Sequence, residues 1–116
     1  SQKKEYEKAA DYLSKALALV KDDNAKIAIN ASIGQCWFYK AQERVAAVKG
    51  VLSPAARAQF NEVYNKAISY LETAKKLDTL KEQKSSWAYP LYGCYYFVKG
   101  AQAPETLAAA ADAGVQ

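Results

Sequence analysis

Few side chains in this sequence are of the types that most often carry out chemistry. There is no histidine, which removes the commonest general base, the commonest metal ligand and the usual charge switch near neutral pH. The acids Glu43 and Glu62 lie at helical spacing from Lys40 and Lys66, so we interpret them as members of surface ion pairs. No glycine-rich phosphate loop is present. The sequence therefore predicts no enzyme activity, no catalytic residue and no cofactor.

The two cysteines, Cys36 and Cys94, are the remaining reactive groups. We expect them on two helices that run side by side with axes about 8–10 Å apart, whereas a disulfide needs Cα atoms within about 7 Å. Without histidine they also make a poor zinc site. We expect two free, buried thiols, which leaves the compartment open between the cytoplasm and a bacterial periplasm or cell envelope.

The elements that position these residues are indicated by an internal repeat. Four residues of one stretch recur 58 positions later, in the pairs Tyr6 and Tyr64, Ala9 and Ala67, Leu13 and Leu71, Ala16 and Ala74. Their steps of three and four place each set on one face of a helix. Because two of the four are alanines, each face can approach another helix closely. The repeat predicts stacked helices.

A second repeat follows the first, at a separation of 59 residues. It matches Gly34 with Gly93, and Trp37 with Tyr96. Glycine inside a helix costs about 1 kcal/mol relative to alanine, so its use at both places indicates close contact with a neighbouring helix. We expect Trp37 and Tyr96 to fill the space beside each glycine.

These patterns resemble the tetratricopeptide repeat family. The pattern Tyr64-x-x-Ala-x-x-x-Leu-x-x-Ala with Leu77-Asp78 resembles the second helix of such a repeat, and Tyr89-x-x-Tyr92-Gly93-x-x-Tyr96 resembles the first. The usual repeat has about 34 residues, so the longer spacing here indicates an extended or divergent, bacterial-type version. The resemblance implies an all-α fold, with antiparallel helical hairpins stacked as a right-handed superhelical array.

Capping signals divide the chain into about five helices within one domain, 1–116. Ser53-Pro54 is the clearest helix start, Asp23 or Asn24 caps the second helix, and Ser86 caps the fourth. Gly50 is expected as a left-handed cap that ends the second helix. The last helix should cover the fourth. We place the helices at about 4–20, 25–49, 54–77, 86–99 and 104–113.

The family resemblance also implies which residues would face a partner. First-type helices line the concave groove of such arrays, and the family's lysine and asparagine clamp for a terminal carboxylate is absent here. Apolar contacts should therefore dominate. An alternative is that the same side chains pack against a neighbouring repeat or against the last helix. The binding candidates are Gln35, Phe38, Tyr39, Trp87, Cys94 and Phe97.

We therefore expect a scaffold that binds a partner protein or peptide through apolar and aromatic contacts. The alternatives are a helical binder of nucleic acid or an anionic surface, and a non-catalytic helical segment of a larger enzyme. The net charge of +4 is mildly basic, but the lysines are dispersed among acids, so nucleic acid is the weaker reading. No run of 18 apolar residues predicts a transmembrane segment. Self-association remains open.

Overall fold

The computed structural model describes residues 2–116, with side chains from residue 5 onward. These residues contain no β-strand, which confirms the all-α class that the sequence predicts. They form five helices: α1 (Gln2–Leu17), α2 (Asp23–Ala47), α3 (Pro54–Leu77), α4 (Lys84–Lys99) and α5 (Pro104–Ala113).

Two ends of α2 differ from the sequence expectation. Its N-cap is Asp22, whose carboxylate accepts a hydrogen bond of 2.9 Å from the backbone N–H of Ala25, and not Asp23 or Asn24. At the other end, Val48 already has an extended backbone, and its N–H donates to the carbonyl of Val45. Gly50, at φ +85°, therefore lies in the connection to α3 and does not cap α2.

The start of α4 also differs from expectation, because its first turn includes Ser86. The chain before α4 is fixed by Asp78, whose carboxylate accepts hydrogen bonds from the backbone N–H groups of Glu82 and Gln83. The Ser86 hydroxyl donates to the carbonyl of the N-cap residue Gln83 at 2.6 Å and so does not cap the helix. Asp78 therefore orders the turn before α4, while the N-cap residue Gln83 makes no side-chain capping hydrogen bond.

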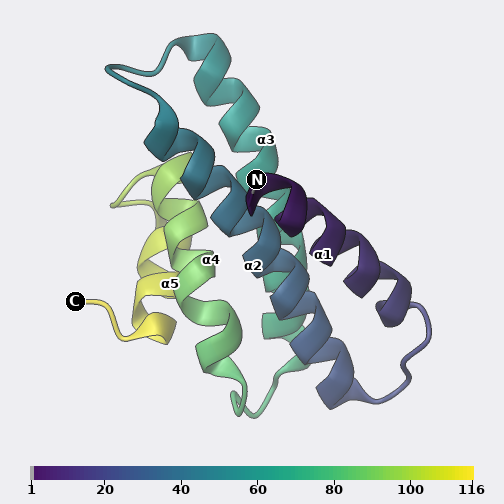
Figure 1. Cartoon of the computed structure of the whole chain (residues 1–116). Helices are drawn as coiled ribbons and strands as arrows, with labels where there is room; N and C mark the ends of the chain where they lie inside the picture. The colour runs from purple at the N-terminus through teal and green to yellow at the C-terminus, as the bar shows by residue number, and fades with distance from the viewer. Residues whose placement is uncertain (1) are drawn as a thin grey trace.

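Helix α2 lies at the centre of the fold (Figure 1). It packs on α1, α3 and α4, while α5 covers the outer side of α4. α2 and α3 form a long antiparallel hairpin, and their connection projects at one end of the molecule. The enclosure of α2 follows from its sequence, which is apolar nearly all round and so needs neighbours on several sides.

Both repeated glycines are sites of close approach, but to different helices. A Cβ atom on Gly34 would lie 2.5 Å from Cγ of Leu71 in α3, and one on Gly93 would lie 2.6 Å from Cε1 of Phe38 in α2. The two glycines occupy matching places in the sequence repeat, but they do not make matching contacts in the structure. The expectation that Tyr96 fills the space beside Gly93 is wrong, because the ring of Phe38 lies there and Tyr96 is 52% exposed.

The basic residues expected in surface ion pairs are used differently. Lys40 is buried, and its ammonium pairs with the carboxylate of Glu7 in α1 instead of with Glu43. The ammonium of Lys66 lies 4.3 Å from the centre of the Trp37 ring, with Lys40 on the same ring at 4.8 Å. Two lysines, one from α2 and one from α3, thus meet over one half-buried tryptophan.

Candidate interaction surface

Three of the six binding candidates are core residues. Phe38 is 2% exposed, and Trp87 and Cys94 are 0% exposed, so the expectation that they look into an open groove is wrong. Trp87 donates its ring N–H to Asp78 at 2.9 Å, a contact inside the domain. Because α4 carries aromatic residues on all sides, its sequence alone does not tell which of them point inward.

The other three candidates occupy separate places. Gln35 donates from its amide to the backbone carbonyl of Ser86 at 2.7 Å, which ties α2 to α4. Phe97 is half-buried against Tyr64, with ring centres 4.6 Å apart. Tyr39 is 44% exposed, which makes it the most exposed of the six predicted residues. The six residues therefore do not form one open face.

The outer face of α4 instead carries a row of tyrosines that the sequence candidates did not include. The spacing of three and four residues places Tyr89, Tyr92 and Tyr96 along one side of the helix. Neighbouring ring centres lie 6.2 Å and 5.8 Å apart. Tyr89 is 59% exposed and Tyr96 52%, whereas Tyr92 between them is half-buried. We call these three residues the tyrosine row.

A shallow hollow adjoins the tyrosine row where α5 crosses α4. Its volume is about 360 Å³, and Leu107 on its edge is 53% exposed. Apolar side chains of α5 and the C-terminal residues form most of the wall. The hollow is lined by Tyr92, Ala101, Gln102, Leu107, Ala110, Ala111, Val115 and Gln116.

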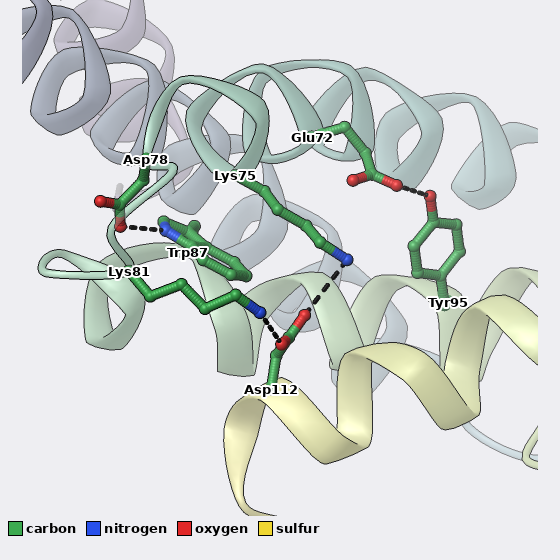
Figure 2. A network of polar contacts seen from close by, with 7 residues as sticks. All are labelled: Glu72, Lys75, Asp78, Lys81, Trp87, Tyr95 and Asp112. Carbon is green, nitrogen blue, oxygen red and sulfur yellow. Dashed lines mark hydrogen bonds and ion pairs between the residues drawn. The ribbon is translucent and has the colours of Figure 1, made fainter.

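A network of polar contacts fixes α4 and α5 on α3 (Figure 2). Asp112 of α5 accepts an ion pair from Lys75 at 3.1 Å and another from Lys81 at 2.7 Å. The hydroxyl of Tyr95 in α4 donates to the carboxylate of Glu72 in α3. Together with the contact of Trp87 to Asp78, these bonds give the tyrosine row a rigid frame.

The protonation of the buried groups suits structural roles. Burial raises the pKa of the Cys94 thiol far above its ordinary value, so the group is not a thiolate nucleophile. Burial, strengthened by the hydrogen bond to Glu72, likewise raises the pKa of Tyr95. Burial acts to raise the pKa of Asp112, but the hydrogen bonds and charges of Lys81 and Lys75 outweigh it and bring that pKa below its usual value.

Both cysteines, Cys36 and Cys94, are free, as the sequence predicts, although Cys36 is only half-buried. Within residues 2–116, no group of three or more histidine, cysteine, aspartate or glutamate side chains is placed to hold a metal ion. None of the helices described is long and apolar enough to cross a membrane.

One signal in the sequence could have revealed the tyrosine row. Tyrosine carries a polar hydroxyl that needs a partner when it is buried, so tyrosines at a spacing of three and four along one side of a helix favour an exposed row. Tyr95, which is not part of this row, is buried with its hydroxyl bonded to Glu72.

Comparison with protein-family models, curated proteins and solved structures finds no match to this chain.

Proposed function

We propose that this protein is a tetratricopeptide-like scaffold that binds a partner protein or peptide through apolar and aromatic contacts. Its binding surface is the tyrosine row together with Leu107. The observation that carries the proposal is the exposure of Tyr89 and Tyr96, each more than half open to solvent in one row. Exposed aromatic residues on a fixed frame are the usual anchors of protein interfaces.

Tyrosine suits this role for a physical reason. Its ring offers a large contact area with only two rotatable bonds, so little conformational entropy is lost when a partner binds. The hydroxyl keeps the free surface soluble. Tyr92 is half-buried and contacts both neighbours in the row, which restricts their positions before a partner arrives.

The hollow beside Leu107 indicates what the partner offers. At about 360 Å³ and with mostly apolar walls, it accepts one bulky apolar side chain. The exposed rings on either side of Tyr92 would then flank that anchor. The partner segment is therefore an amphipathic helix or short peptide with one large apolar residue at its centre.

The packing of consecutive helices supports the tetratricopeptide-like part of the proposal. Each helix packs on the next one in the chain, and the two glycine-bearing helices α2 and α4 also contact each other. In a stacked array of hairpins, these are the expected neighbours. The right-handed superhelix itself is part of the proposal.

A selection of displayed random peptides against the whole chain tests this function. We expect enriched peptides to be amphipathic, with a large central apolar residue, and to lose at least roughly tenfold in affinity for the double variant Tyr89→Lys/Tyr96→Lys. Leu80→Lys is the matched control, because Leu80 is also exposed, at 78%, but lies in the connection between α3 and α4, away from the tyrosine row. Peptides that bind the double variant as well as the wild type would contradict the proposed surface.

A further inference from the structure

Helices α1 and α3 present the same face. Beyond the residues that first revealed the repeat, the identity at a spacing of 58 extends along this whole side of each helix. Only α3 has this face covered in the structure. The matching positions are Ala9 and Ala67, Tyr12 and Tyr70, Leu13 and Leu71, Ala16 and Ala74, and, in the turn just after α1, Leu19 with Leu77.

The two helices also sit on their next neighbours in the same way. The ring of Tyr6 in α1 stacks on Tyr39 in α2, with centres 6.3 Å apart. The ring of Tyr64 in α3 packs on Phe97 in α4 at 4.6 Å. Both members of the second pair lie 58 positions after those of the first. α1 is thus placed against α2 as α3 is placed against α4, and their remaining faces correspond.

In α3 this corresponding face is covered by α2. Ala67, Leu71 and Ala74 are each 0% exposed. Leu71 approaches Gly34 so closely that any side chain there would overlap it. Leu77 lies beside the first two turns of α2, near Ile27. The contact of α3 with α2 therefore shows what this repeated face binds within the molecule. It binds a helix that carries glycine opposite Leu71.

In α1 the same face is open. Ala9 is exposed, Tyr12 is 67% exposed, and Leu19, just past the end of α1, is 82% exposed. A hollow of about 350 Å³ lies along it. Its edge is basic, although Lys15 is partly neutralised by Asp11 at 3.5 Å. The residues lining the hollow are Lys8, Asp11, Tyr12, Lys15, Ala16 and Leu19.

We propose that the open face of α1 is a docking site for one amphipathic helix of another protein, which packs on α1 as α2 packs on α3. The docked helix carries glycine opposite Leu13, because the matching Leu71 leaves no room for a Cβ atom opposite it. Acidic residues along its edge would meet Lys8 and Lys15. This inference deepens the proposed scaffold function and rests on it, but it uses a separate surface at the other end of the fold.

A peptide with the sequence of α2, residues 23–47, is the probe. We expect the fluorescently labelled peptide to bind the whole chain in an anisotropy titration. The variant Ala9→Leu should weaken this binding at least roughly tenfold, because the larger side chain blocks close approach. Ala9 is exposed, so the substitution leaves the fold intact. The matched control is Ala108→Leu, at an exposed position of α5, which should bind as the wild type does.

A change in the peptide tests the glycine separately. Gly34→Leu in the peptide should weaken binding to the wild-type chain by a similar factor. A peptide that does not bind, or that binds wild type and Ala9→Leu equally, would overturn the proposal. A dimer of the wild type that Ala9→Leu splits would overturn the choice of partner, since a second copy would then cover the face.

If the free peptide aggregates, the same helix can be joined covalently to the protein and tested there. Placing a copy of residues 23–58 directly before Ser1 preserves the spacing of 58, so the added helix can reach α1. We expect the extended chain to melt at a higher temperature than the wild type, and Ala9→Leu within it to cancel the gain. No gain in melting temperature would count against docking.

The two binding proposals fail independently in these experiments. Tyr89→Lys/Tyr96→Lys should leave the affinity for the α2 peptide unchanged, because the tyrosine row lies on α4. Loss of peptide binding in that double variant alone would show that the peptide uses the tyrosine row, and would overturn the α1 site while leaving the proposed function standing. Loss in Ala9→Leu alone supports the α1 site.

Discussion

Helices α1 and α3 carry the same stripe of side chains, yet only α3 buries it. Leu71 is 0% exposed, whereas its counterpart Leu13 is half-buried. Among the side chains of α1 that the structure describes, the most buried is that of Ala10, which lies outside the repeated stripe. The difference shows that the number of neighbouring helices, and not the local sequence, decides how much each stripe contributes to stability.

The C-terminal ends of α1 and α3 differ as well. Asp78 ends α3 and is 4% exposed, and its carboxylate organises the turn that leads into α4. The position 58 residues earlier is Val20, which offers no side-chain acceptor. The C-terminal half is therefore stabilised by both apolar and polar contacts. The difference between α1 and α3 can be tested for each kind of contact separately.

The largest effect should come from truncating the repeated leucine. Leu71→Ala should lower the free energy of unfolding by about 2–5 kcal/mol, because it leaves a cavity against Gly34. Leu13→Ala should cost about half of that or less, because one side of Leu13 already faces water. Urea unfolding followed by circular dichroism measures both. Equal losses would show that the two stripes are equally enclosed.

The next largest loss of stability is expected from replacing the acid at the C-terminal end of α3. Asp78→Val gives α3 the residue that α1 has, and leaves the buried ring N–H of Trp87 without its acceptor. The expected loss is about 2–3 kcal/mol, with a shift in tryptophan fluorescence that reports the changed environment of Trp87. If the free energy of unfolding is unchanged, the contact between Asp78 and Trp87 does not account for any difference in stability between the C-terminal ends of α1 and α3.

A smaller, pH-dependent effect is expected for Asp112→Asn. The loss of its two ion pairs should cost roughly 1 kcal/mol at neutral pH. Because the folded-state pKa is lowered, the contribution of Asp112 is present above the unfolded value of about 3.9 and is lost as pH falls through the folded value.

Melting curves of wild type and Asp112→Asn between pH 7 and pH 2 measure this contribution. The difference in stability between the two proteins should therefore be constant at neutral pH and shrink in acid. A difference that stays the same down to the lowest pH would mean that Asp112 contributes through packing and not through charge.

The smallest effect is expected on the solvent side of α1. The ion pair between Asp11 and Lys15 spans 3.5 Å, and both side chains are more than 70% exposed. Asp11→Ala should change the free energy of unfolding by about 0.5 kcal/mol or less. High salt should remove even that. A larger loss would indicate that α1 is held by contacts other than those with α2.

Local signals in the sequence predicted much of this fold. The serine of Ser53-Pro54 caps α3 as expected, accepting from the N–H of Ala56 at 3.1 Å. The repeat indicated helices and the residues that share a face. It did not indicate that Ala9 is exposed while Ala67 is buried, because both occupy the same place in the repeated stripe and differ in the helices that pack on them.

The candidate surface was harder to predict than the fold, for the same reason. Phe38 and Trp87 were expected in a groove and lie in the core, whereas Tyr96 was expected inside and lies outside. All of them belong to helices with apolar residues on several sides. The choice of inward face there depends on contacts between helices, such as that of Phe38 with Gly93, which no spacing rule contains.

The connection between α2 and α3 has one further consequence. At its tip Val51 is 97% exposed, and a side chain on Gly50 would touch nothing. The connection projects from the body of the molecule (Figure 1). Cutting the chain after Lys49 would therefore sever no packing. It would leave two fragments, 1–49 and 50–116, which share a broad interface between α2 and α3. We expect the two fragments to reassemble through this interface into a split, two-part protein.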